Sequence, residues 1–147
     1  MFKYKIFNEF ELPTQQEKSE MIDFLFHHLE QYGDKKEDIE KAIQYAIKET
    51  PSFGGYIITS LLETGISGVV VINKTGMKGY IPENILVYIA THHDLRGRGI
   101  GKKLMETALS LANGDVALHV EPHNPAKGLY EKLGFTNKYL EMRYKQK

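Results

Sequence analysis

Seven residues, 96–102 with the sequence RGRGIGK, limit the fold of this chain more than any other segment. They follow a continuous apolar run, residues 85–90, and lead into apolar residues at helical spacing from Ile100 onward. Glycines lack a Cβ atom, so successive backbone N–H groups can turn inward together, and the first turn of a helix adds unpaired donors with a partial positive charge. The segment therefore predicts a strand–turn–helix unit that attracts a phosphate group, with a tight turn among solvated bases as the alternative.

Charge is divided unevenly along the chain. The 147 residues include 19 Lys plus Arg and 19 Asp plus Glu. Residues 1–65 hold 12 acids and 7 bases, whereas residues 66–147 hold 7 acids and 12 bases, and Arg96 and Arg98 flank Gly97. The zero net charge predicts neither nucleic-acid binding nor attraction to a membrane surface, and we expect an anionic ligand on the basic second half.

The sequence contains no cysteine, which excludes a disulfide framework, a thiolate-bound metal and a cysteine nucleophile. No stretch approaches the roughly 18 apolar residues of a membrane span. Residues 1–12 alternate charged and apolar residues, unlike an export signal. Without repeats or linkers, the chain is expected to form one domain over residues 1–147 of a cytoplasmic protein.

The first third of the chain predicts a strand and two helices. Alternation of apolar residues with lysine predicts a strand over residues 2–6. Capping-box signatures, in which a Thr or Asp is followed three residues later by Glu, begin at Thr14 and Asp34. Each precedes apolar residues at helical spacing, so we expect helices that end at Gly33 and before Pro51.

The remaining patterns predict alternating strands and helices. Residues 56–62 and 66–72 are rich in β-branched residues and predict a hairpin around a Thr-Gly turn, and residues 85–90 predict a central strand covered on both faces. The later elements are a helix over 100–112, a strand over 116–120, a short helix from Asn124 to Leu133 and an extended tail over 135–144. The predicted order is β-α-α-β-β-β-α-β-α-β.

Two well-known phosphate-binding motifs match residues 96–102 poorly. A P-loop requires Ser or Thr directly after its lysine, whereas Lys102 is followed by Lys103. A dinucleotide-binding fingerprint requires a third glycine where Lys102 stands, although Glu121 follows about 20 residues later, where an acid that binds ribose is expected. A nicotinamide-dependent reductase is therefore a distant alternative.

The spacing Arg96-x-x-Gly99-x-Gly101 resembles the pyrophosphate-binding signature of the GNAT acetyltransferase superfamily. A second segment, residues 124–135 with the sequence NPAKGLYEKLGF, is also similar to that family, as is the order of elements. The resemblance implies an α/β (α+β) fold: a single GNAT-like domain whose mixed, mostly antiparallel sheet of about six or seven strands is flanked by four helices.

The same resemblance implies acetyl-CoA as cosubstrate and no metal. The strand that ends at Ile89, Ala90 and Thr91 would diverge from residues 116–120, and its free main-chain groups would pair with the pantetheine arm, because unpaired backbone groups inside a domain need partners. The residues implied to hold the pyrophosphate are Arg96, Gly97, Arg98, Gly99, Ile100, Gly101 and Lys102.

Two residues of the second motif are implied to contact the cosubstrate. Tyr130 would be the general acid that protonates the CoA thiolate. Its position on an apolar helix face also fits a packing residue, and both roles stay open. Asn124 would cap the short helix, with a hydrogen bond to CoA compatible with that role.

The general base is the weakest point of the resemblance. The family places a Glu on the central strand, and Glu83, at the start of that strand, is the nearest match here. An exposed loop carboxylate is the alternative role for Glu83. Glu121 is a competing base, and deprotonation through water would need neither.

The paired histidines are not expected to bind a metal. His27 and His28 are adjacent on a helix, where neighbouring side chains point about 100° apart. His92 and His93 precede the glycine turn and are expected to shape that loop.

The favoured hypothesis is an acetyl-CoA-dependent N-acetyltransferase in which a primary amine attacks the thioester directly. The alternative is a non-catalytic acyl-CoA-binding sensor module on the same fold. The expected partner is a small-molecule amine or a protein amine, with no nucleic acid and no membrane. The sequence does not identify the acceptor, and a homodimer is compatible with it.

Overall fold

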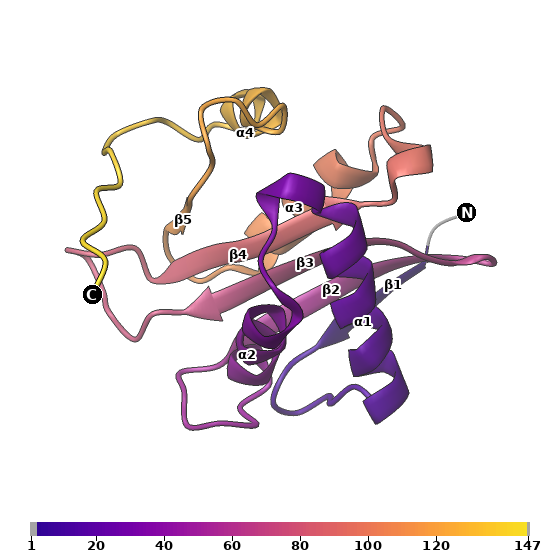
Figure 1. The fold of residues 1–147 in the computed structure, drawn as a ribbon. Coiled ribbons are helices and arrows are strands. Elements are labelled where there is room, and N and C mark those ends of the chain that lie inside the picture. Colours follow the sequence, from indigo (N-terminus) through magenta and orange to yellow (C-terminus); the bar gives the residue numbers. More distant parts are fainter. Residues whose placement is uncertain (1–2, 147) are drawn as a thin grey trace.

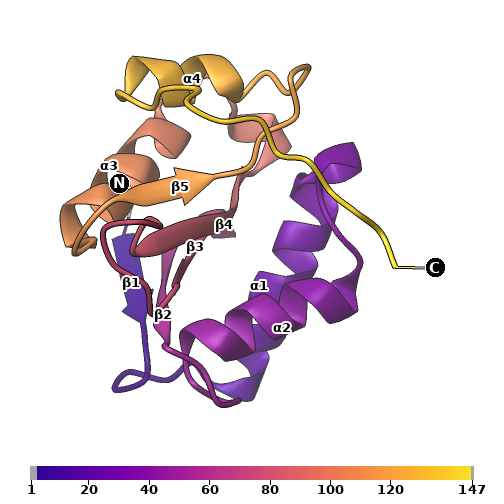
Figure 2. The same ribbon diagram turned by 90° about the vertical axis from the view of Figure 1, so that its left-hand side faces the viewer.

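The computed structural model describes residues 3–146, so Phe2 of the first predicted strand lies outside the described residues. These residues form a five-stranded sheet with the order β1-β2-β3-β4-β5. Helices α1 and α2 cover one face of the sheet and α3 the other, and α4 lies at the β5 side of the sheet (Figures 1 and 2). No helix among the described residues has the length and apolar character needed to cross a membrane.

The first helix begins as its sequence predicts. Strand β1 (Lys3–Phe7) is followed by α1 (Gln15–His28). The backbone N–H of Glu17 donates to Thr14 Oγ1 (3.0 Å), and the backbone N–H of Thr14 donates to Glu17 Oε1 (2.9 Å). The capping box is therefore confirmed, and it satisfies two donors that have no partner within the helix.

The second helix does not begin with the predicted cap. A short 3-10 helix (Glu30–Tyr32) precedes α2 (Lys36–Ala46), whose N-cap is Lys35 with no side-chain hydrogen bond. The Asp34 carboxylate instead accepts a hydrogen bond from the hydroxyl of Tyr88 on the central strand (2.5 Å). The prediction of a second capping box was wrong, because the Tyr88 hydroxyl binds the Asp34 carboxylate that the sequence pattern predicted to cap α2.

The central strands form the expected hairpin and its neighbour. Strands β2 (Gly55–Leu62) and β3 (Gly65–Lys74) pair antiparallel, and β4 (Asn84–Thr91) pairs antiparallel with β3. Two buried clusters lie on opposite faces of these strands. One contains residues of α1 and α2, and the other contains residues of α3 together with Tyr130. The central strand is thus covered on both faces, as its apolar run predicts.

The last third of the chain follows the predicted order up to its tail. It contains α3 (Ile100–Leu111), β5 (Val116–Leu118) and α4 (Lys127–Lys132). Residues 135–144 have no assigned strand, so the described sheet has five strands and the expectation of six or seven was wrong. The alternating tail residues Leu140 and Met142 are exposed and belong to no strand of the described sheet, since a strand pattern needs a partner to form a ladder.

Candidate functional site

Strands β4 and β5 separate after three residue pairs. Their parallel ladder joins Asn84 to Val116, Ile85 to Ala117 and Leu86 to Leu118, and then ends. Strand β4 continues to Thr91 beside β3 alone. The divergence expected from the sequence is present (Figure 1), so the β5-facing edge of the end of β4 has no neighbouring strand among the described residues.

A bulge in β4 lies where the two strands separate. On the β3 side, Val71 pairs with Tyr88 and Ile72 pairs with Leu86, which leaves Val87 without an opposite residue. A bulge bends its strand and increases the local twist. It also reverses the side-chain alternation, so Leu86 packs in the α3 cluster while Tyr88 packs in the α1–α2 cluster. The bulge therefore accounts for the bend of β4 away from β5.

The free edge of β4 presents main-chain groups of alternate residues. The backbone N–H of His92 donates to Ser67 O on the β3 side (2.9 Å). Since N–H and C=O groups of successive residues point to opposite sides of a strand, Ala90 also faces β3, whereas Ile89 and Thr91 face the gap. These two residues carry the main-chain groups that a ligand in the gap could pair with.

The glycine loop opens onto a cavity of about 240 Å³ at the end of this gap. Gly97 and Gly99 have φ values of 83° and 80°, and a Cβ atom built on either would meet nothing within 4 Å. Glycine is therefore required here by backbone conformation, with open space in front of it. The cavity lining also includes Thr91 of β4, Ile100 and Gly101 of α3, and Leu129 of α4.

The N-terminus of α3 lacks a side-chain cap. Its N-cap is Gly99, with no capping hydrogen bond and no acidic residue in the first turn, although the helix is 12 residues long. The first N–H groups of a helix have no partner within it and carry a partial positive charge. Lys102, which lines the same cavity, is exposed. The arrangement is chemically suited to an anionic ligand such as a phosphate.

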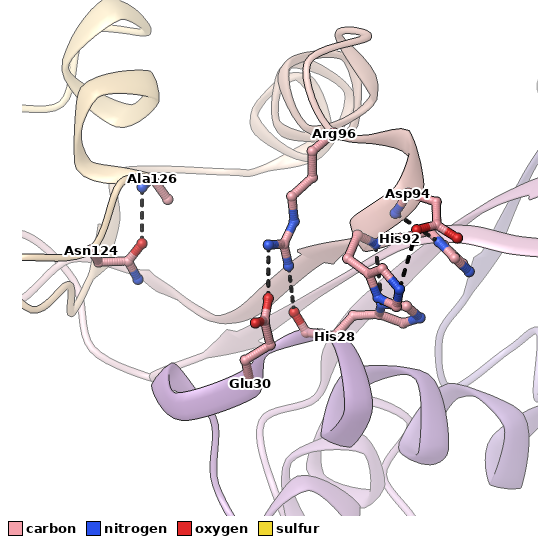
Figure 3. A network of polar contacts seen from close by, with 8 residues as sticks. His28, Glu30, His92, Asp94, Arg96, Asn124 and Ala126 are labelled. Atoms are coloured by element: carbon pink, nitrogen blue, oxygen red, sulfur yellow. Dashed lines mark hydrogen bonds and ion pairs between the residues drawn. The ribbon is translucent and has the colours of Figure 1, made fainter.

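The side chain of Arg96 is directed toward the end of α1, away from the loop amides (Figure 3). Its Nη2 donates to the carbonyl oxygen of His28 (2.9 Å), and its Nη1 lies 2.8 Å from Oε1 of Glu30. Sequence reasoning assigned Arg96 to ligand binding. In the structure, its guanidinium connects the loop to α1, while the residue still lines the cavity.

The structure places part of the segment 124–135, the second motif of the sequence, at the cavity. Leu129 lines the cavity, and the next residue, Tyr130, is buried in the α3 cluster with its ring centroid 6.0 Å from that of Phe135. Burial raises the pKa of Tyr130 to about 12. The hydroxyl therefore stays protonated at neutral pH, which suits a proton donor and is equally compatible with a packing role.

Asn124 caps the turn that leads into α4. Its Oδ1 accepts a hydrogen bond from the backbone N–H of Ala126 (2.9 Å; Figure 3), and its carbonyl oxygen accepts one from Lys127 (3.1 Å). The helix begins at Lys127, three residues later than Asn124. The predicted N-cap was therefore wrong: the N-cap is Ala126, without a side-chain hydrogen bond, and the Asn124 side chain instead organises the turn ahead of the helix.

The structure does not bring Glu83 to the cavity. Glu83 precedes the first residue of β4, whereas the cavity lies beyond the last. Its Oε1 accepts from the backbone N–H of Asp115 (2.7 Å) and its Oε2 from that of Gly79 (2.9 Å). These backbone hydrogen bonds lower the pKa of the carboxyl group below its usual range. The competing acid, Glu121, is exposed in the segment before α4.

Sequence reasoning missed a cluster of four histidines beside the loop. His28 ends α1, and its ring centroid lies 4.3 Å from that of His92 and 4.8 Å from that of His93. His27 lies 5.5 Å from His93 by the same measure. Burial, followed by the neighbouring histidines and Arg96, lowers the pKa of His28 to about 4. The sequence held one sign of this cluster: two pairs of adjacent histidines, one at the end of α1 and one after β4.

A family model connects this geometry to known proteins. The model described as an acetyltransferase (GNAT) domain matches residues 55–137, more than half of the chain. A peptidyl-lysine N-acetyltransferase, YjaB of Salmonella typhimurium, is 50% identical over 42 residues. That match spans 29% of each protein, less than a third of the relative's length.

Solved structures share the fold over nearly the whole chain. A GNAT-family acetyltransferase of Streptococcus pneumoniae superposes with a TM-score of 0.69 at 19% identity, covering 99% of this chain and 98% of that one. A ribosomal-protein-alanine N-acetyltransferase of Brucella melitensis gives a TM-score of 0.67 at 16% identity, covering 99% of each chain. With the family model matched across the hairpin, the central strand, the glycine loop and α4, the chain belongs to the GNAT acetyltransferase family.

Proposed function

We propose that this protein transfers an acetyl group from acetyl-CoA to a primary amine, which attacks the thioester directly. The observation that carries the proposal is the position of the uncapped N-terminus of α3 at the open end of the gap between β4 and β5. A cosubstrate with an anionic diphosphate at one end and an amide-containing arm at the other matches both features. The glycine conformations and the open space in front of them support the fit.

The diphosphate would be held by the loop backbone. The proposed donors are the N–H groups of residues 97–102, with the exposed side chains of Arg98 and Lys102 adding positive charge. Arg96 contributes differently, because its guanidinium fixes the loop against the end of α1 through His28 and Glu30. This contact orients the loop before any ligand arrives.

The pantetheine arm would lie along the free edge of β4. Ile89 and Thr91 present N–H and C=O groups to the gap, and an amide-containing chain can pair with them as an added strand. Ala90 supports the same strand from its other side, where it pairs with Val69 of β3. The gap thus gives the thioester a defined direction into the domain.

Acetyl-CoA supplies an activated acetyl group as a thioester. As the amine nitrogen bonds to the acetyl carbon and the carbon–sulfur bond breaks, Tyr130 is proposed to donate its hydroxyl proton to the departing thiolate. The raised pKa of Tyr130 keeps that proton available at neutral pH. The attacking amine loses its proton to water, because both oxygens of Glu83 accept backbone hydrogen bonds at the other end of β4.

Protein amines are the proposed acceptors. Support comes from the partly matching relative, named for peptidyl-lysine, and from a structural neighbour named for the alanine of a ribosomal protein. The acidic first 65 residues also favour a cationic substrate through electrostatic steering. Lysine side chains and N-terminal amines share the primary amine that the mechanism requires.

Two measurements test the proposal. Calorimetry should show saturable binding of acetyl-CoA to the full chain, and mass spectrometry should show one acetyl group added to peptides that carry either a free lysine or a free N-terminus. A peptide with both amines blocked is the control. Binding of acetyl-CoA with no turnover on a broad amine panel would support the sensor alternative, and no binding would overturn both.

A further inference from the structure

Four histidines from two distant parts of the chain converge beside the glycine loop. Figure 3 labels two of them, His28 and His92. His27 and His28 end α1, while His92 and His93 follow β4. The Nδ1 atoms of His28 and His93 lie 3.0 Å apart. His28 is buried, whereas His27 and His93 are exposed at the surface. The proposed acetyl transfer uses none of these imidazoles, so their convergence needs its own explanation.

The hydrogen bonds of the cluster bring the Nδ1 atoms of two imidazoles together. The backbone N–H of His93 donates to Nδ1 of His28 (3.2 Å), so this Nδ1 carries a lone pair. Nε2 of His93 lies 3.3 Å from Oδ1 of Asp94, which favours a proton on that nitrogen. Nδ1 of His93 either carries a proton and donates it to Nδ1 of His28, or is deprotonated and can bind a metal ion together with that nitrogen. A metal ion at this position would take the place of the hydrogen bonds that Nδ1 of His28 accepts.

A third imidazole nearby favours a metal ion over a proton shared by two rings. His27, His28 and His93 each offer one ligand nitrogen, and these atoms all lie within 4.8 Å of one another. A proton shared by two rings gains nothing from a third ring, whereas a tetrahedral zinc site needs ligand nitrogens about 3.4 Å apart. Because His27 and His93 are exposed, their rings can rotate by the small amount required.

We propose that His27, His28 and His93 form a binding site for a divalent transition-metal ion of the zinc class. Imidazole nitrogens suit zinc, copper and nickel, and three of them leave a fourth position for water. Oδ1 of Asp94 lies 3.3 Å from Nε2 of His93, and an ion pair there would leave the other ring nitrogen to face the metal. His92 stays outside the site, because its Nδ1 accepts the backbone N–H of Asp94 (3.2 Å).

The surrounding charges and elements are compatible with this ion. Arg96, whose guanidinium donates to the carbonyl oxygen of His28, is paired with Glu30 at 2.8 Å. The three ligands join the end of α1 to the segment directly before the glycine loop. A bound ion would therefore fasten these two elements together, and metal binding should raise the melting temperature of the protein whether or not it transfers acetyl groups.

Zinc binding to the full chain, with every affinity-tag histidine removed, tests the proposal. Titration with zinc sulfate should give one site per chain, and cobalt(II) should give the absorption spectrum of a tetrahedral ion. His27→Ala and His93→Ala should abolish this binding while the fold, checked by circular dichroism, is retained. Asp94→Asn should weaken it about tenfold, as removal of a partner of a metal-bound histidine typically does.

The controls are histidines outside the proposed ligand set. His92→Ala should keep the site, as should a double variant of the exposed His119 and His123. Three outcomes would overturn the proposal: no saturable binding by the unmodified chain, unchanged binding in both His27→Ala and His93→Ala, or loss of binding only in His92→Ala. Because His27 and His93 are exposed, their replacement tests the site without disturbing the core.

Discussion

Leu86 of β4 and Leu118 of β5 form the last pair of the parallel ladder between these strands, and the bulge at Val87 follows directly. The ladder between β4 and β5 therefore ends at the same position as the bulge in β4. The free edge that results ends at Thr91, which also lines the cavity of the glycine loop. The proposed sites for the arm and for the diphosphate are thus continuous.

Replacing Thr91 by proline tests the proposed pairing with the arm. The N–H of Thr91 faces the gap, so proline removes one donor there without removing a donor to β3. A single hydrogen bond contributes about 0.5–1.5 kcal/mol, so calorimetry should show acetyl-CoA binding weakened by about 2–12-fold. Thr91→Val keeps the N–H group and is the matched control. Equal affinity in the two variants would rule out pairing at this residue.

Gly99→Ala tests the loop through backbone conformation. Gly99 has a φ of 80°, which an alanine adopts only with strain of about 1 kcal/mol or more. The loop should therefore shift, and acetyl-CoA affinity should fall about tenfold or more. Gly79→Ala is a close control, since Gly79 has a φ of 82° and equally open space but lies outside the cavity lining. Similar losses of affinity in both variants would indicate general destabilisation.

Local patterns predicted the elements well where the partners of a residue are close in sequence. In the capping box, Thr14 and Glu17 form hydrogen bonds with each other within four residues, and the box is present as expected. Asp34 carries the same local signature, but the hydroxyl of Tyr88, 54 residues away, binds its carboxylate. A pattern of residues cannot reveal a competing partner that only the folded chain brings near.

The same limit applies to the site. The glycine loop was predictable because φ and the start of the helix are local properties. The histidine cluster was not, because its halves come from α1 and from the end of β4 and meet only when α1 packs on the sheet. The contacts of Arg96 with His28 and Glu30 depend on the same packing.

Tyr130→Phe separates proton donation from packing. Phenylalanine keeps the buried ring and removes only the hydroxyl, so the melting temperature should change little. If Tyr130 donates a proton, kcat should fall about 100-fold or more. Since the pKa of Tyr130 is about 12, deprotonation of this residue should cause no loss of the wild-type rate between pH 7 and about pH 10. A variant with normal kcat would leave Tyr130 as a packing residue.

Glu83→Gln distinguishes a turn-stabilising carboxylate from a general base. The backbone N–H groups of Gly79 and Asp115 lower the pKa of Glu83 in the folded protein, so the ionised form stabilises the fold. This stability is present above the carboxyl pKa of the unfolded chain and is lost as the pH falls through the lower folded value. The variant should therefore melt below the wild type at pH 7, and the difference should shrink as the pH falls below about 4. Its kcat should stay within about twofold of the wild type, whereas a loss of about 100-fold or more at unchanged acetyl-CoA affinity would identify Glu83 as the base.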